Sequence, residues 1–260
     1  MPTVRDIEQT LYDLAPKELA QDWDNVGLLI GKPDREVHKV LVALDVTETT
    51  AAEAWWTGAE LIVAHHPVMN CSWHPVQTIR DDDPQGRLFY RLIEGGTAAI
   101  CMHTNLDAAE GGVNDALAAR LGLRKAEKIP NTDGIARMGE LPEPMTLPAF
   151  LAWVRGALRP NGIRFTDSGR LIRRVAVGGG ACGEYLTAAA VNGCDAFVTA
   201  DLKYNHFLDA QSLGLTLLDA GHFPTEDVIC PVLAEYLREK FPGLHVEKSA
   251  SHREAVQYYV

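Results

Sequence analysis

The sequence has no apolar run that approaches the roughly 18 residues a membrane-spanning helix needs. Its first stretch, MPTVRDIEQTLYDL, carries charges throughout and has no apolar segment of the kind found in secretory signal peptides. We therefore expect neither a membrane span nor a cleaved leader. Together these absences predict a cytoplasmic protein.

Cysteine is scarce and irregularly spaced. The chain has 5 cysteines, an odd number, and no C-x-x-C pair. They are Cys71, Cys101, Cys182, Cys194 and Cys230. This pattern argues against a disulfide framework and is typical of reduced thiols in a cytosol. We expect most of them to be small buried hydrophobic residues.

Positively charged residues are in deficit. The chain has 24 Lys and Arg residues and 35 Asp and Glu residues, which gives a formal net charge of -11. An acidic surface repels phosphate backbones, which makes nucleic-acid binding unlikely. A small anionic substrate remains compatible with this charge, because a bound metal ion reverses the local sign. The 47% apolar and 23% charged composition is that of an ordinary globular protein.

Predicted strands and helices alternate along the first half of the chain. Helical periodicity covers residues 3–15, with Thr3 placed to cap the start, and recurs at 48–57, 85–94 and 113–121. Between these helices lie the short apolar runs 39–45, 61–67 and 97–103. This alternation is typical of βα units and predicts an α/β fold with a largely parallel sheet.

The second half repeats the plan of the first. Residues 40–63 align without a gap on 175–198, and 97–104 align on 215–222. We therefore predict two related α/β halves, 1–126 and 127–260, with the Pro- and Gly-rich stretch 128–148 as their connection. Because ligands bind at the carboxyl ends of strands in α/β sheets, a site in the cleft between the halves follows.

Three segments at predicted strand ends carry candidate metal ligands. His65 and His66 directly follow the apolar run LIVA, where they are either ligands or hydrogen-bonded loop histidines. Asp107 closes the segment HTNLD, as a ligand or as a helix cap. His222 and Glu226, in GHFPTE, share a face if their segment is helical, although a strand-end histidine and a helix-start acid are an equal alternative.

As a set, these nitrogen and oxygen donors suit Zn, Mn or Fe. Five ligands exceed the needs of one open catalytic zinc. Two divalent ions about 3.5–4 Å apart are a natural solution. The sequence therefore predicts a dinuclear metal centre.

Other polar residues are candidates for supporting roles. His103 is either a general acid or base or a buried hydrogen-bonded histidine. Asp24 and Asn25 either contact a substrate or shape the turn before Gly27. Asp201 is a candidate either for substrate contact or for orienting a metal ligand. His206 is a candidate for orienting a metal ligand.

The glycine run 178–180 either lets backbone amides approach a phosphate or forms a simple turn, and the turn is favoured. Four further histidines lie in polar contexts that predict surface positions. They are His38, His74, His245 and His252.

The ordered motifs of the chain resemble those of the GTP cyclohydrolase I type 2 family, also called the Ngg-interacting-factor-three-like proteins. The motifs are DNVG (24–27), LDVT (44–47), AHHP (64–67), HTNLD (103–107), GGGACG (178–183) and DAGHFPTE (219–226). The resemblance spans nearly the whole chain. At residues 199–201 the chain has TAD where the family often has TGD.

This resemblance implies two interleaved α/β repeats that form one structural unit with mostly parallel mixed sheets. A dinuclear centre lies in the cleft between them. The matching ligand positions are His65, His66, Asp107, His222 and Glu226. It also implies ring-shaped homohexamers. Longer members carry an inserted domain, for which this chain of 260 residues is too short.

The implied activity is a hydrolase reaction on a purine nucleotide. Water activated by the metals attacks C8 of GTP and formate is released, with His103 as a proton carrier and Asp24, Asn25 and Asp201 as substrate contacts. The same ligand set would equally support phosphoester or amide hydrolysis. The alternative is a metal-binding, metal-delivery or regulatory protein without turnover.

Overall fold

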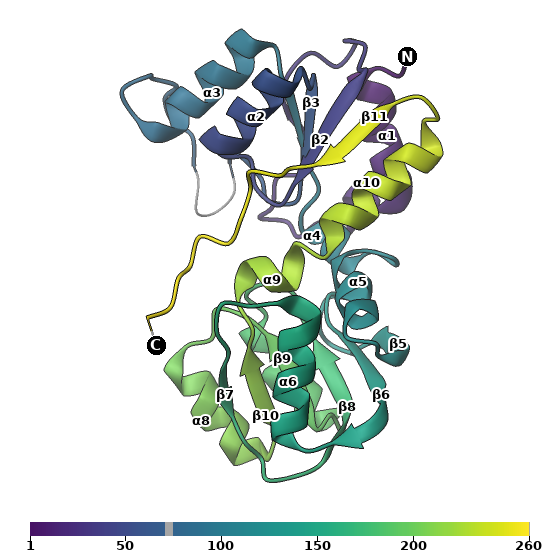
Figure 1. Cartoon of the computed structure of the whole chain (residues 1–260), viewed down its shortest axis with the longest axis vertical. Helices are drawn as coiled ribbons and strands as arrows, with labels where there is room; N and C mark the ends of the chain where they lie inside the picture. The colour runs from purple at the N-terminus through teal and green to yellow at the C-terminus, as the bar shows by residue number, and fades with distance from the viewer. Residues whose placement is uncertain (71–74, 260) are drawn as a thin grey trace. The chain divides into compact units, whose positions relative to one another are not determined.

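The computed structural model describes residues 1–70 and 75–259, which form two compact units (Figure 1). Unit 1 combines Met1–Leu106 with Cys230–Arg253, and unit 2 combines Asp107–Ile229 with Glu254–Val260. The chain leaves unit 1 after Leu106, returns at Cys230 and leaves again after Arg253. The two units are therefore interleaved along the sequence.

Unit 1 contains a five-stranded sheet in the order β1-β4-β3-β2-β11. The strands β4, β3, β2 and β11 are parallel, while β1 runs antiparallel to β4 at one edge. Their bounds are β1 Gly27–Ile30, β2 Lys39–Ala43, β3 Leu61–Ala64, β4 Ala98–Cys101 and β11 His245–Lys248. The strands β3 and β4 are buried along their whole length, because helices cover both faces of the sheet.

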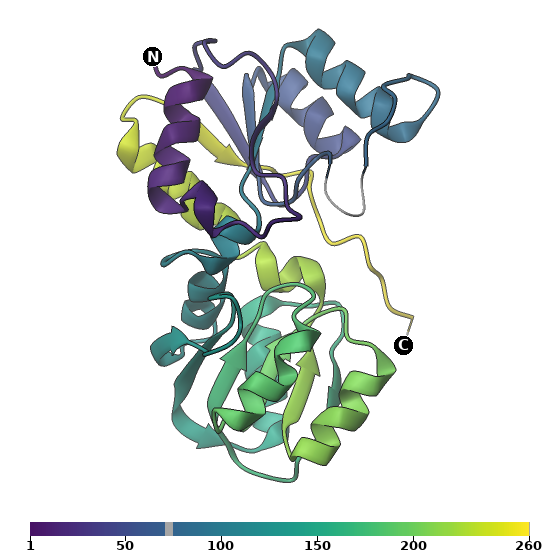
Figure 2. The same ribbon diagram turned by 180° about the vertical axis from the view of Figure 1, so that it is seen from behind.

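Helices α2 and α3 pack on one face of this sheet, and α1 and α10 lie together beyond the other (Figures 1 and 2). A hydrogen bond from the Tyr236 hydroxyl to the Thr10 carbonyl joins the second pair. Thr3 caps α1 as predicted, and α2 ends at Gly58 in the left-handed conformation. The helices of unit 1 are α1 Val4–Leu14, η1 Lys17–Leu19, α2 Glu48–Thr57, α3 Pro84–Gly95 and α10 Ile229–Lys240.

Unit 2 contains a six-stranded sheet in the order β5-β6-β8-β9-β10-β7. Its central strands β8, β9 and β10 are parallel, and the outer pairings are antiparallel. The bounds are β5 Arg124–Lys128, β6 Arg137–Met145, β7 Arg164–Thr166, β8 Ile172–Val177, β9 Ala196–Thr199 and β10 Thr216–Asp219.

Helices cover both faces of the second sheet too. Phe150 and Val154 of α6 pack with Leu117 of α5 on one face, while Leu186 of α7 and Ala210 of α8 pack on the other. The remaining bounds are α4 Thr104–Ala108, α5 Val113–Arg120, α6 Leu147–Leu158, η2 Gly183–Tyr185, α7 Leu186–Val191, α8 Tyr204–Leu213 and α9 His222–Glu226.

The sheets support the predicted duplication. In unit 1 the antiparallel edge strand β1 lies next to β4, which is followed by β3 and β2. In unit 2 the antiparallel edge strand β7 lies next to β10, which is followed by β9 and β8. Val40 pairs with Leu61 in unit 1, and the aligned Val175 pairs with Ala196 in unit 2. Because both pairs follow the gap-free alignment of 40–63 on 175–198, the repeated segments have the same strand register.

Three details differ from the sequence reasoning. The stretch 128–148 is more than a connection, because it contains the nine-residue strand β6. Residues 107–126, predicted within the first half, pack in unit 2, and 230–253 return to unit 1. The two compact units therefore have other bounds than the predicted halves 1–126 and 127–260.

The thiols of Cys101, Cys182, Cys194 and Cys230 are buried, as expected, while Cys71 and His74 lie outside the described residues. Of the predicted surface histidines, His38 and His245 are exposed, whereas the prediction for His252 is wrong because its side chain is only 12% exposed and bonds to Asp45. Within the described part of the chain, the helices are too short or too polar to cross a bilayer.

Candidate metal centre

The carboxyl ends of the parallel strands in unit 1 gather three imidazoles at one edge of the sheet. His65 and His66 follow β3, and His103 follows β4. One ring nitrogen of each lies within 4.8 Å of those of the other two. The ring centroids of His65 and His66 are 4.9 Å apart, and those of His65 and His103 are 5.1 Å apart. The structure thus brings the proposed proton carrier His103 into one cluster with the predicted ligand pair.

In each of these imidazoles, Nδ1 is held by an oxygen atom. His65 Nδ1 lies 2.7 Å from the Met102 carbonyl oxygen, and His66 Nδ1 lies 2.7 Å from Asp45 Oδ1. Since a carbonyl or a carboxylate oxygen accepts a hydrogen bond, Nδ1 must carry the proton. In the neutral ring the lone pair then lies on Nε2. This is the tautomer that an Nε2 metal ligand requires.

Asp45 links His66 to a second histidine. Its other oxygen lies 2.8 Å from Nε2 of His252, a half-buried residue of the C-terminal segment. Burial alone would raise the pKa of Asp45, but the hydrogen bonds from His252 and His66 hold it well below its usual range. The charged carboxylate is therefore stable at neutral pH and can fix the orientation of the His66 ring.

Asp24 plays the corresponding part for His103. Its fully buried carboxylate accepts from His103 Nδ1 at 2.8 Å and from both the backbone and the hydroxyl of Thr104. Burial would raise its pKa, yet these bonds lower the pKa of Asp24 to about 2. The geometry favours an orienting role over the predicted substrate contact. The neighbouring Asn25 amide donates to the Met69 carbonyl at 2.8 Å, and its substrate role stays a prediction.

Unit 2 presents its own cluster at the carboxyl end of β10. His222 and Glu226 lie one turn apart on α9, with His222 Nε2 2.9 Å from Glu226 Oε2. His222 Nδ1 lies 2.7 Å from Asp201 Oδ2. Although burial lowers the pKa of His222, the Glu226 and Asp201 carboxylates raise it to about 11. Asp107, buried on α4, places a carboxylate oxygen within 4.8 Å of one of Glu226.

The glycine run 178–180 makes room for this cluster. A Cβ on Gly180, whose φ is +63°, would lie 2.1 Å from Glu226 Oε1. The Gly179 amide donates to Asn114 and the Gly180 amide to the Thr225 hydroxyl. These amides are therefore engaged within the protein. The run acts as a turn that admits the Glu226 carboxylate, in agreement with the favoured interpretation.

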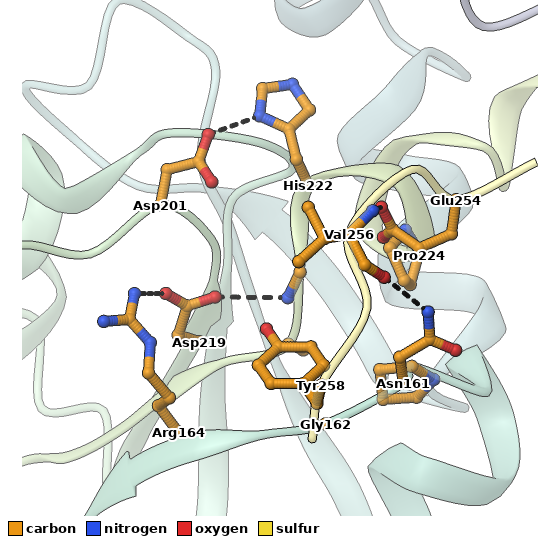
Figure 3. A pocket seen from close by; sticks show the side chains of 13 residues that line it. Asn161, Gly162, Arg164, Asp201, Asp219, His222, Pro224, Glu254, Val256 and Tyr258 are labelled. Atoms are coloured by element: carbon orange, nitrogen blue, oxygen red, sulfur yellow. Dashed lines mark hydrogen bonds and ion pairs between the residues drawn. The ribbon is translucent and has the colours of Figure 1, made fainter.

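A cavity of about 360 Å³ adjoins His222 within unit 2 (Figure 3). Asp201 and His222 form part of its wall, with Arg164 and Asp219 below them. Asp201 has a left-handed φ of 52°, which short polar side chains tolerate. Its hydrogen bond to His222 fits an orienting role, and its substrate contact stays a prediction. His206, by contrast, accepts from the Lys203 amide at 3.2 Å and closes the first turn of α8.

Comparisons with known proteins bear on this arrangement. A sequence model of Duf34/NIF3 (NGG1p interacting factor 3) matches residues 2–255. The chain belongs to the Duf34/NIF3 family. Relatives named "GTP cyclohydrolase 1 type 2 homolog" include one from Clostridium perfringens, 33% identical over 91% of this chain and 92% of that protein. Another, from Streptomyces coelicolor, is 36% identical over 92% of this chain and 87% of its own length.

Solved structures agree with the family assignment. A Bacillus cereus protein related to NIF3 superposes with a TM-score of 0.92 at 25% identity, covering 100% of this chain and 99% of that one. A Staphylococcus aureus protein gives a TM-score of 0.91 at 28% identity, with 99% of each chain covered. The NIF3 fold thus extends over the whole of this chain.

The donors of this NIF3 chain fit a divalent cation. The clusters offer imidazole nitrogens and carboxylate oxygens, which suit Zn, Mn or Fe, and their Nδ1 atoms are engaged as ligand histidines require. Sequence reasoning assigned no role to Asp45 or His252. Asp45 lies in the motif LDVT at the end of β2, a position that could have indicated it. The polar surroundings of His252 gave no such signal.

Proposed function

We propose that this chain is a divalent-metal-dependent hydrolase that acts on a purine nucleotide. Five residues hold two metal ions. They are His65, His66, Asp107, His222 and Glu226. The supporting observation is the group of three imidazoles in unit 1. One ring nitrogen of each lies within 4.8 Å of those of the other two, and all three Nδ1 atoms lie against oxygen acceptors.

The clustering of these imidazoles and carboxylates does not stabilise the fold by itself. Three buried or half-buried imidazoles in one place cost desolvation energy, and two buried carboxylates close together repel each other. Bound divalent ions offset both costs. Such ions, when bound, lower the pKa of water and polarise an electrophile.

The protein's own residues would then position and move protons. Asp24 holds His103 through Nδ1, so that Nε2 faces the histidine cluster and can exchange a proton with a reacting group. Asp45 and Asp201 orient His66 and His222 in the same way. Both His66 and His222 thus have a carboxylate hydrogen-bonded to Nδ1.

The choice of a guanine nucleotide comes from the relatives' names, which refer to GTP cyclohydrolase. The corresponding reaction is hydrolytic opening of the ring at C8 of GTP with release of formate. Ring-shaped hexamers and a cytoplasmic location remain predictions from the family resemblance and the sequence.

The test is release of formate from GTP by chain loaded separately with Zn²⁺, Mn²⁺ and Fe²⁺. We expect His66→Ala to abolish release, because it removes a ligand from the histidine cluster. His245→Ala is the matched control, since His245 is an exposed histidine that pairs with Glu247. Turnover that survives in His66→Ala would contradict the assignment. Tight metal binding with no turnover of any nucleotide would favour a metal-binding or delivery protein instead.

A further inference from the structure

The C-terminal tail forms one wall of the cavity in unit 2. Glu254, Val256 and Tyr258 line it opposite Asp201 and His222 (Figure 3). These tail residues belong to unit 2, although the preceding segment, Cys230–Arg253, belongs to unit 1. The volume of about 360 Å³ lies in the range of small-molecule sites.

Specific contacts hold the tail in place. The Asn161 amide donates to the Val256 carbonyl at 2.7 Å, and the Val256 amide donates to Glu254 Oε1 at 2.7 Å. The Tyr258 ring lies against Gly162, where an added Cβ would be only 3.2 Å from it. The tail therefore presents an aromatic ring and a carboxylate to the cavity that His222 also lines.

The charges of the cavity do not suit a phosphate. The Arg164 guanidinium is neutralised by its ion pair with Asp219 and also donates to the Leu202 carbonyl at 2.9 Å. Asp201 is engaged with His222. Glu254 adds a further carboxylate, with Oε2 beside Gly221, 3.7 Å from the position of a Cβ there. A wall of this kind favours a ligand that presents N–H donors and a flat face.

We propose that this cavity binds the guanine base of the substrate, with Glu254 as the residue that selects guanine. This inference rests on the proposed function for the choice of a purine nucleotide. A carboxylate can accept two parallel hydrogen bonds from N1–H and the 2-amino group of guanine. Adenine presents a lone pair at N1, which a carboxylate repels. Tyr258 offers its ring face to the base.

This placement lies next to the proposed metal centre. His222 lines the same cavity and is one of the five proposed ligands. A base held by Glu254 and Tyr258 would therefore bring its ring close to His222. Its phosphates would then extend away from the acidic wall. The tail thus acts as a specificity element for the hydrolytic site.

The experiment is calorimetric titration of the 260-residue chain with guanosine, inosine and adenosine. Nucleosides carry no phosphate, so the affinities report on the base site alone. We expect the wild type to bind guanosine best and adenosine worst. Glu254→Gln should lose about tenfold or more in guanosine affinity, because a charge-assisted pair is replaced by one neutral acceptor. Inosine, which lacks the 2-amino group, should be less affected.

Gln257→Ala is the control, because Gln257 is an exposed tail residue outside the cavity lining. It should bind guanosine as the wild type does. The inference would be overturned if Glu254→Gln bound guanosine as tightly as the wild type does. It would also be overturned if the wild type bound adenosine as tightly as guanosine. Formate release is measured on the same proteins. Metal-dependent release without guanine selection overturns only the base site, whereas guanosine selection without release overturns only the hydrolase.

Discussion

Replacing Asp45 by Asn tests whether the carboxylate behind His66 serves metal binding. Asp45 accepts from His66 Nδ1 at 2.7 Å and from His252 Nε2 at 2.8 Å, one bond on each oxygen. An amide keeps the shape but has only one oxygen, so it must present an NH₂ group to one of the two rings. If that ring is His66, its Nδ1 becomes the acceptor and Nε2 carries the proton, which prevents ligation.

The size of the effect follows from this geometry. Loss of a carboxylate behind a metal-bound histidine typically costs 10- to 100-fold in metal affinity, about 1.4–2.7 kcal/mol. Since the Asn side chain can still turn its oxygen toward His66, we expect a loss near the lower limit, about tenfold. His252→Ala should cost less, because it leaves the Asp45–His66 bond in place.

The assay is competition between the protein and a chromophoric chelator for Zn²⁺ at neutral pH. Asp34→Asn is the matched control, because Asp34 is an exposed aspartate that pairs with Arg5 on the surface. Circular dichroism and thermal melting establish that each variant is folded. If Asp45→Asn binds Zn²⁺ as tightly as Asp34→Asn, the orienting role of Asp45 is refuted.

Two further predictions concern close packing and pH. Gly180→Ala should destabilise the chain by about 1–3 kcal/mol and weaken metal binding, because the φ of Gly180 is +63° and the new Cβ would lie 2.1 Å from Glu226 Oε1. Denaturant melts measure the loss of stability, and chelator competition measures the loss of metal affinity. Burial raises the pKa of Glu53, but hydrogen bonds from Ser249 and Ser251 lower it overall from 4.5. The stability these bonds provide is present above that value and is lost as the pH falls through the lowered pKa, so wild type should lose more stability than Glu53→Gln between about pH 5 and 3. If melting experiments show that both proteins lose the same stability over that pH range, this explanation is wrong.

Much of the fold was predictable because its local signals agree with its tertiary structure. The apolar runs at 39–45, 61–67 and 97–103 became β2, β3 and β4, since parallel strands buried on both faces need continuous apolar sequence. The strand β6 escaped prediction because its prolines and glycine are typical of loops. Its antiparallel partners, β5 and β8, determine its conformation, and those pairings are not evident in the local sequence.

The candidate site was predictable to a similar extent. Histidines and acids that follow apolar runs, such as His65 and His222, indicated the strand ends where the clusters lie. The hydrogen bonds behind them were not predictable, because Asp45 and His252 are distant in sequence and meet only once β2 and the C-terminal segment have folded.

The most direct test of the account is anomalous scattering from crystals of metal-supplemented protein, combined with elemental analysis. We expect two metal peaks per chain within bonding distance of His65, His66, Asp107, His222 and Glu226. Crystals that contain no metal after supplementation, or whose peaks lie away from these side chains, would contradict it.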